Sequence, residues 1–343
     1  MNLLGGGGAR QSRCRKRSPQ PATAVFAGVA ARCRMGVVIE VAPIVHARLA
    51  ELGQRGAEWL AELPDVVAGL ERRWSMTVDE VLPGGSTALV ARVRISDDRD
   101  GVVKLAIPDS GASEEAQVLM RAHGRGYVKL LDHDPDSGAL LLEPLGPSLD
   151  CLGSSPEFQI ERLCATLRQA WRVPPETTPS AVDLKATALA EYVEQMWERL
   201  EQPCSERVVA QALGCARRRV ADHVPARCVL VHGDPHSANA LQVPVSRAGG
   251  ESGFVFVDPD GFVADPTYDL GVVLRDWCEE LTNGRPVALA EDYCGRLADQ
   301  TGLDETAIWE WGFLERVSTG LCLLQYGAHG DGRAFLDTAE MLA

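Results

Sequence analysis

The stretch VLVHGDPHSANALQ, residues 229–242, decides the fold, because an apolar run leads directly into a dense set of polar side chains. Asp234 follows the apolar run, and Asn239 comes after four intervening residues. A second apolar run, FVFVDPDG at residues 254–261, also ends in carboxylates, of which Asp258 is the first. If the two runs are neighbouring strands, they bring Asp234, Asn239 and Asp258 to one place. Oxygen ligands of this kind suit Mg²⁺, which also needs phosphate oxygens to complete its octahedron.

The spacing from Asp234 to Asn239 is that of a catalytic loop in phosphoryl-transfer enzymes. There the aspartate accepts a hydrogen bond from the acceptor hydroxyl, and the asparagine binds a metal ion. One alternative is a zinc site, since His232 and His236 stand at positions i and i+4, but this spacing joins two imidazoles only on a helix. The glycine and proline between them disfavour a helix. The other alternative is two hairpins whose aspartates only cap loops, and the order of the two segments argues against it.

Three upstream features stand in the order that a nucleotide site needs. A turn at Gly84, Gly85 and Ser86 lies between β-type runs, where glycine lets backbone N–H groups approach phosphates. Lys104 follows on the apolar run GVVKLAI, within reach of α and β phosphates, and Glu115 follows on a helical stretch. Each feature alone has a plain interpretation as a hairpin turn, an edge-strand lysine or a solvated glutamate. Together they predict an ATP site in which Glu115 pairs with Lys104.

The segment LLLEPLG, residues 140–146, is expected to form the hinge between two lobes. Pro144 has no N–H group, so adenine is expected to bond to the Glu143 carbonyl and the Leu145 amide. Further along, Asp269 in PTYDLG is expected to open a helix and to brace the catalytic loop. We therefore interpret Asp269 as structural.

The apolar pattern changes along the chain from helical to β-type and back to helical. Residues 44–74 have a helical apolar face with an expected break at Pro64. Ser155 is predicted to cap a helix, another helix is predicted over residues 206–221, and a helical tail runs from about residue 269. We expect an α+β fold divided into a leader over residues 1–35, N-terminal helices over 36–74, a β-rich ATP-binding lobe over 75–146, and a mainly helical lobe over 147–343 with the catalytic loop and substrate site.

Charge is distributed unevenly along the chain. The net charge of −14 hides a leader, residues 1–34, with seven basic residues and no acidic one, while the remainder holds 27 basic and 48 acidic residues. This acidic body repels nucleic acid and favours cationic ligands or solubility. No apolar run is long enough for a membrane span, and the ten cysteines, with no CxxC pair, are typical of a reducing cytosol. We interpret the leader as disordered, upstream of a natural start at Met35.

These segments resemble the aminoglycoside and hydroxyurea antibiotic-resistance kinases, which have a protein-kinase-like fold. VLVHGDPHSANALQ, FVFVDPDGFVADPTYDLGVVLRDW and LLLEPLGPSL are very similar to the streptomycin 6-phosphotransferase branch of that family. RLCATLRQAWRVP and ERVSTGLCLLQYG support the same branch. The resemblance covers residues 36–343 and leaves only the leader outside.

The resemblance implies a two-lobed kinase that binds ATP between a β-rich N-lobe and a mainly helical C-lobe, with Mg²⁺ as cofactor. It implies these roles: catalytic for Asp234, metal-binding for Asn239 and Asp258, phosphate-anchoring for Lys104 with Glu115, and adenine-contacting for Leu145. Protein kinase activity is not expected, because HGD replaces HRD and no APE-type segment follows Asp258. The polar turn VSRAGGESG enlarges the interval between Asn239 and Asp258, which leaves open whether Asp260 shares in metal binding.

The expected acceptor is streptomycin, a cationic antibiotic whose two guanidinium groups suit carboxylate partners. Asp276, Glu279 and Glu280 follow the PTYDLGVVLRDW segment and are candidate substrate ligands, although a solvated acidic face is the plain alternative. We expect a cytoplasmic monomer with no nucleic-acid or membrane partner. Two other functions stay open: a kinase of this fold for another small alcohol such as hydroxyurea, and a nucleotide-binding protein without catalysis. The pattern does not determine which hydroxyl is phosphorylated.

Overall fold

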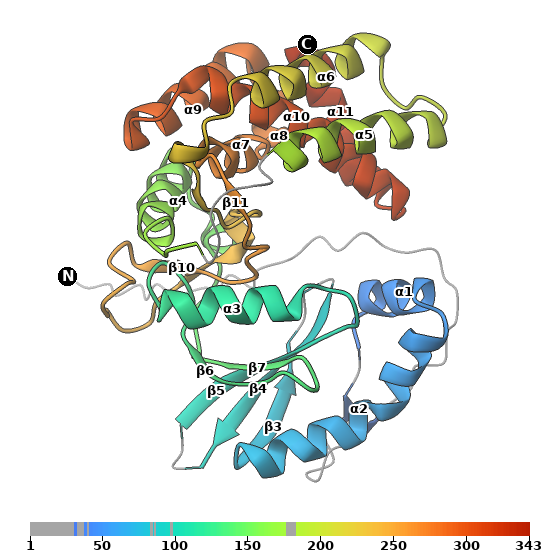
Figure 1. Cartoon of the computed structure of the whole chain (residues 1–343), viewed down its shortest axis with the longest axis vertical. Helices are drawn as coiled ribbons and strands as arrows, with labels where there is room; N and C mark the ends of the chain where they lie inside the picture. Colours follow the sequence, from blue (N-terminus) through green and yellow to red (C-terminus); the bar gives the residue numbers. More distant parts are fainter. Residues whose placement is uncertain are drawn as a thin grey trace, which may run out of the picture.

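The computed structural model describes residues 31–32, 38–39, 41–82, 85, 87–96, 99–175 and 183–343. Figure 1 shows two lobes, with a β-sheet and its helices in the N-lobe and a larger group of helices in the C-lobe. Most of the predicted leader lies outside the described residues. Its Ala31–Arg32 forms strand β1, which pairs with β2 (Val38–Ile39), and the disorder of the leader stays a prediction.

The N-lobe is built on one antiparallel sheet with the strand order β3-β4-β5-β7-β6. Its strands are β3 (Met76–Val81), β4 (Ala88–Ile95), β5 (Arg99–Ala106), β6 (Leu130–Asp134) and β7 (Ala139–Leu142). Strand β5 pairs with both β4 and β7, which places Lys104 opposite Val90 on one side and Leu140 on the other. Helix α3 (Ala112–Ala122) connects β5 to β6. Lys104 is therefore on an interior strand of the sheet.

Two helices, α1 (Pro43–Glu51) and α2 (Gln54–Arg73), share one apolar core with the sheet. The predicted helix break is in the wrong place: the chain breaks at Gly53, which has a φ of +57°, and α2 continues through Pro64. A proline inside a helix removes one backbone hydrogen bond. The burial of Leu63 and Val67 on either side of Pro64 offsets that loss.

The C-lobe is organised around helix α10 (Glu305–Gln325), which is buried along most of its length and packs against several other helices of the lobe. The remaining helices are α4 (Pro156–Ala170), α5 (Asp183–Arg199), α6 (Glu206–Ala221), α7 (Thr267–Leu274), α8 (Cys278–Asn283), α9 (Pro286–Thr301) and α11 (His329–Leu342). The predicted cap is confirmed, since Ser155 accepts a hydrogen bond from Phe158 N at the start of α4. The helix predicted over residues 206–221 is confirmed as α6.

Two short antiparallel strand pairs carry the polar segments, and Figure 1 labels one strand of each, β10 and β11, on the side of the C-lobe that faces the N-lobe. Strand β8 (Val229–Leu230) pairs with β11 (Val263–Ala264), and β9 (Ala240–Gln242) pairs with β10 (Phe254–Phe256). The backbone of β10 contacts the N-lobe, because Val128 N donates to Phe256 O at 2.8 Å. Among the described residues, no helix is long and apolar enough to cross a membrane.

Candidate active site

The connection between β8 and β9 carries the predicted catalytic loop. Asp234 follows β8, and Asn239 ends a short 3-10 turn (Ser237–Asn239). The Asn239 side-chain amide donates to the Asp234 carbonyl at 3.0 Å, and Val257 N donates to the Asn239 carbonyl at 3.0 Å. The predicted adjacency of the two polar segments is therefore present.

Asp269 braces the catalytic loop through hydrogen bonds to its backbone, as the sequence predicted. It lies in the first turn of α7, is completely buried, and accepts hydrogen bonds from His232 N and Gly233 N, both at 2.9 Å. The Trp171 indole N–H donates to the same carboxylate at 2.8 Å. Gly233 has a φ of +95°, and a Cβ there would lie 2.5 Å from Asp260 Cβ, so only glycine fits. Asp260 thus packs against the turn that Asp269 braces.

His232 links the two polar segments through its ring. Its Nδ1 accepts from Asp234 N at 3.1 Å, and its Nε2 bonds to the Val257 carbonyl at 2.9 Å, so the ring is neutral with its proton on Nε2. Burial lowers the pKa of His232 to about 4, although nearby acidic groups oppose this. Both ring nitrogens are used, and neither is directed to His236 as the zinc interpretation requires.

Lys104, Glu115 and Asp258 meet in one ion-pair cluster between the sheet, α3 and the second polar segment. The Lys104 ammonium donates to Glu115 at 2.5 Å and to Asp258 at 2.6 Å. Burial alone would lower the pKa of Lys104, but the two carboxylates outweigh it and raise that pKa above its ordinary value. The lysine is charged, and the predicted pair with Glu115 is present.

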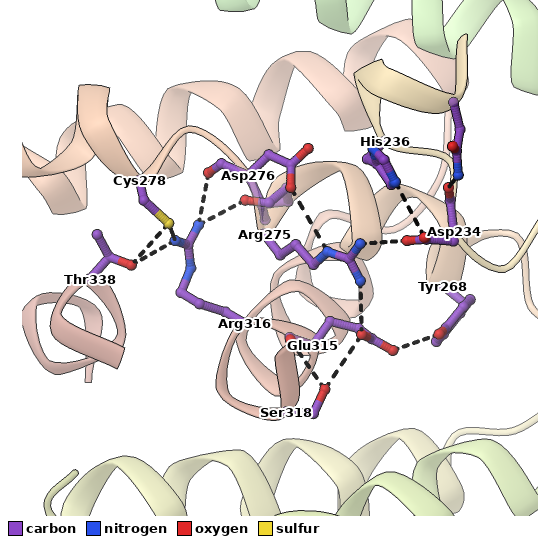
Figure 2. A network of polar contacts seen from close by, with 12 residues as sticks. Asp234, His236, Tyr268, Arg275, Asp276, Cys278, Glu315, Arg316, Ser318 and Thr338 are labelled. Atoms are coloured by element: carbon purple, nitrogen blue, oxygen red, sulfur yellow. Dashed lines mark hydrogen bonds and ion pairs between the residues drawn. The ribbon is translucent and has the colours of Figure 1, made fainter. Parts of the chain in front are cut away.

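Asp234 is held by an arginine and a histidine side chain. Its Oδ1 accepts from Arg275 at 2.5 Å, and its Oδ2 lies 3.3 Å from His236 Nε2, as drawn in Figure 2. Burial would raise the pKa of Asp234, but Arg275 and His236 outweigh burial and hold the pKa well below its usual range. Asp234 is therefore ionised at neutral pH.

The hinge segment contains a contact that the sequence did not indicate. Arg247, from the enlarged turn between β9 and β10, forms a two-point ion pair with the Glu143 carboxylate. The same guanidinium donates to Gly124 O at 2.6 Å and Tyr127 O at 3.1 Å. No described residue bonds to the Glu143 carbonyl or the Leu145 amide. Both groups expected to bind adenine are thus available.

The remaining predicted ligands are spread over the two lobes. Gly85 has a φ of +79°, as a tight glycine turn requires, while Gly84 and Ser86 lie outside the described residues. Asp276 is partly buried beside Arg275, with 3.8 Å between its carboxylate and Arg275 Nε. Glu279 and Glu280 are exposed in the first turn of α8. Of the three acidic candidates, Asp276 is the one linked to Asp234 through Arg275.

Sequence reasoning missed Arg275, Glu315 and Arg247. The first two carried a signal: Arg275 directly follows an entirely apolar helical run, and Glu315 stands inside the apolar stretch of α10. Charged residues in such positions are rarely buried unless they are paired. Arg247 had no such signal, because its turn reads as an ordinary polar loop.

Comparison with known proteins agrees with this geometry. The family described as aminoglycoside/hydroxyurea antibiotic resistance kinase matches residues 73–327. A streptomycin 6-kinase of Streptomyces glaucescens is 27% identical over 87% of this chain and 94% of its own length. A hydroxyurea phosphotransferase of Kitasatospora aureofaciens is 29% identical over 69% of this chain and 68% of its own length.

Solved structures show the same fold at low sequence identity. A Plasmodium vivax ethanolamine kinase matches with a TM-score of 0.55 at 15% identity, covering 82% of this chain and 87% of that one. A choline kinase of Streptococcus pneumoniae matches with a TM-score of 0.54 at 15% identity, covering 81% and 99%. The fold is thus the two-lobed protein-kinase-like fold, and the chain belongs to the aminoglycoside/hydroxyurea antibiotic resistance kinases as a phosphotransferase of that family.

Proposed function

We propose that this enzyme transfers the γ-phosphoryl group of ATP to the 6-hydroxyl of streptomycin, with Mg²⁺ as cofactor. The observation that carries the proposal is a continuous set of contacts across the predicted site. Lys104 binds Asp258, Val257 next to it bonds to the Asn239 carbonyl, and the Asn239 side chain bonds to the Asp234 carbonyl. The choice of streptomycin rests on the Streptomyces glaucescens relative, which is similar along nearly its whole length.

The residues present fit a magnesium–nucleotide site. Asp258 has 43% of its side-chain surface exposed, and Asn239 offers its amide oxygen from the adjacent loop. Among the described residues, no group of three or more His, Cys, Asp or Glu side chains forms a metal site by itself. Asn239 and Asp258 would therefore hold Mg²⁺ together with nucleotide phosphates. When bound, the ion neutralises charge on the phosphate oxygens.

Lys104 would hold the phosphates from the N-lobe side. It is nearly buried, with 9% of its side-chain surface exposed, and the ion pair with Glu115 on α3 fixes the position of its ammonium group. One Glu115 oxygen is buried without a hydrogen-bond partner among the described residues. The charge of the carboxylate is therefore balanced mainly by the Lys104 ammonium. We expect the ammonium to keep its bond to Glu115 when it contacts phosphate.

Asp234 would orient the acceptor hydroxyl. In the reaction the hydroxyl oxygen bonds to the γ-phosphorus, the bond from phosphorus to the ADP oxygen breaks, and the hydroxyl proton passes to Asp234 late. An aspartate whose pKa lies well below its usual range is a weak base. Because the transition state is loose, position matters more than basicity.

Asp276, Glu279 and Glu280 are the proposed partners of the streptomycin guanidinium groups. Carboxylates bind guanidinium through paired hydrogen bonds, and Asp276 lies nearest to Asp234 through the shared neighbour Arg275. We expect Asp276→Asn to raise the KM for streptomycin more than Glu279→Gln or Glu280→Gln. If one of these variants leaves the KM for streptomycin unchanged, the substituted residue is not part of the acceptor site.

A second candidate acceptor is hydroxyurea, because the Kitasatospora aureofaciens relative is named as a hydroxyurea phosphotransferase. Hydroxyurea carries no guanidinium group, so it does not need a carboxylate partner such as Asp276. The two candidates therefore make different demands on Asp276. We further propose that the enzyme works in the cytoplasm as a monomer.

Release of ADP from ATP tests the proposal. Purified enzyme is incubated with ATP and Mg²⁺ and with streptomycin, a 2-deoxystreptamine aminoglycoside or hydroxyurea, and Asp234→Asn serves as the control. We expect release with streptomycin alone and its loss in the control. Release with another acceptor contradicts the substrate. Full activity in Asp234→Asn contradicts the role given to Asp234.

A further inference from the structure

Arg275 lies between the proposed catalytic carboxylate and the core of the C-lobe. It directly follows α7 and has 13% of its side-chain surface exposed. One nitrogen, Nη2, donates to Asp234 Oδ1 at 2.5 Å, and the other, Nη1, donates to Glu315 Oε2 at 3.3 Å. Figure 2 shows the guanidinium lying between the two carboxylates.

Glu315 is fixed by its own surroundings. It lies on the buried helix α10, and 5% of its side-chain surface is exposed. The Tyr268 hydroxyl donates to Oε1 at 2.5 Å, and the Ser318 hydroxyl lies 3.5 Å from Oε2. Glu315 therefore provides a rigid anchor for Arg275.

The two oxygens of Asp234 are unequally held. Oδ1 has the short contact to Arg275, whereas Oδ2 has, among the residues that the structure describes, only the 3.3 Å contact to His236. Of the Asp234 side-chain surface, 36% is exposed. We propose that Arg275, anchored by Glu315, is a positioning residue that fixes Oδ1 of Asp234 and so turns Oδ2 toward the acceptor hydroxyl. This inference rests on the proposed function in taking Asp234 as the residue that orients that hydroxyl.

The chemistry of arginine explains why it occupies this place. The terminal torsion of an aspartate is broad, so an unclamped carboxylate samples many orientations. A guanidinium presents several N–H donors in one rigid plane and can hold two carboxylates at once, whereas a lysine ammonium is a compact point charge on a flexible stem. An arginine here lowers the basicity of Asp234 but fixes the orientation of its carboxylate. In a reaction with a loose transition state, the orientation of this group contributes more to the rate than its basicity.

The test compares two buried arginine–glutamate pairs whose glutamates both lie on α10. Arg275→Lys keeps the charge and loses the clamp, and the double variant Arg275→Met/Glu315→Gln removes both members of the pair so that Glu315 is not left as a lone buried charge. The matched control is Arg219→Met/Glu310→Gln. Arg219 has 10% and Glu310 4% of its side-chain surface exposed, and this pair does not contact Asp234. Circular dichroism and thermal midpoints verify folding.

We expect kcat to fall about 10²-fold in the double variant. In Arg275→Lys we expect kcat to fall by a smaller but measurable factor. The KM for ATP should stay within about twofold in both, since Arg275 does not reach the nucleotide residues. The control pair should keep kcat within about twofold. A wild-type kcat in Arg275→Lys overturns the inference, and so does an equal fall of kcat in the control.

A crystal structure of the Arg275 variants tests the clamp without any acceptor. We expect the Asp234 carboxylate to turn away from its wild-type orientation while the loop backbone stays in place. An unchanged carboxylate overturns the inference. If the wild type transfers phosphate to no acceptor, the proposed function fails, and the orientation of Asp234 in these crystals still decides whether Arg275 positions it.

Discussion

Removing the Arg247 guanidinium should destabilise the protein far more than removing a surface arginine. Arg247 and Glu143 have 11% and 16% of their side-chain surfaces exposed, so both charges are largely withdrawn from water. Breaking a buried pair by deleting one partner costs about 3–5 kcal/mol, because the other charge is left uncompensated. In Arg247→Met, Glu143 retains only the hydrogen bond from Lys129 N at 2.9 Å.

The control for this prediction is an exposed ion pair. Arg296 and Asp292 each have 47% of their side-chain surface exposed, and exposed ion pairs add little to stability because water and salt screen them. Arg296→Met should therefore lower the free energy of unfolding far less than Arg247→Met does. Arg247→Met should lower it by about 3–5 kcal/mol.

The assay is urea unfolding followed by tryptophan fluorescence, with the midpoint and the slope measured for each variant. A double-mutant cycle with Glu143→Gln separates the pair from general packing. We expect the double variant to be less destabilised than the two single variants together, by about 1–3 kcal/mol. Additive effects, or a loss in Arg247→Met no larger than in the control, refute the reasoning.

Three further predictions concern the site and its supports. Lys104→Met should lower kcat/KM for ATP by at least about 10²-fold; a steady-state value within a few-fold of wild type contradicts the anchoring role. His232 has a pKa of about 4 in the folded protein against about 6.5 when unfolded, so its contribution to stability is complete above pH 6.5 and is lost as the pH falls toward 4. Between pH 7 and 4.5 the wild type should lose about 2–3 kcal/mol more unfolding free energy than His232→Gln. Equal losses in the two proteins, measured by urea titration, contradict this prediction. Gly126→Ala should lower the thermal midpoint sharply, because a Cβ at φ +70° would lie 2.5 Å from the Ala170 nitrogen; an unchanged midpoint contradicts that packing.

Local sequence patterns predicted the parts of the site that lie at the ends of apolar runs. Asp234 and Asp258 each follow such a run, Asn239 is placed by its spacing from Asp234, and the period-2 and period-3.6 patterns distinguished strands from helices. Asp269 was correctly expected to brace the loop, since an aspartate in the first turn of a buried helix has few solvent contacts. These predictions depend on residues close together in the chain.

Contacts between distant segments could not be predicted in this way. Arg247 reaches the hinge because its turn folds back on Gly124 and Glu143, over more than 100 residues of sequence. Pro64 was expected to end a helix, but tertiary packing of the flanking apolar residues decided otherwise. Local propensity describes a residue without its tertiary neighbours. The position of Arg247 and the continuation of α2 through Pro64 both depend on the segments that pack against these residues.

The central claim is that Asp234 directs the phosphoryl group of ATP onto the 6-hydroxyl of streptomycin. The most direct measurement is proton and phosphorus NMR of the product made by the wild type and by Asp234→Asn. We predict that the wild type forms one phosphate ester, with its phosphorus coupled to the proton on C6, and that Asp234→Asn forms none. An ester at another hydroxyl, no ester from the folded wild type, or an ester formed equally by Asp234→Asn contradicts the claim.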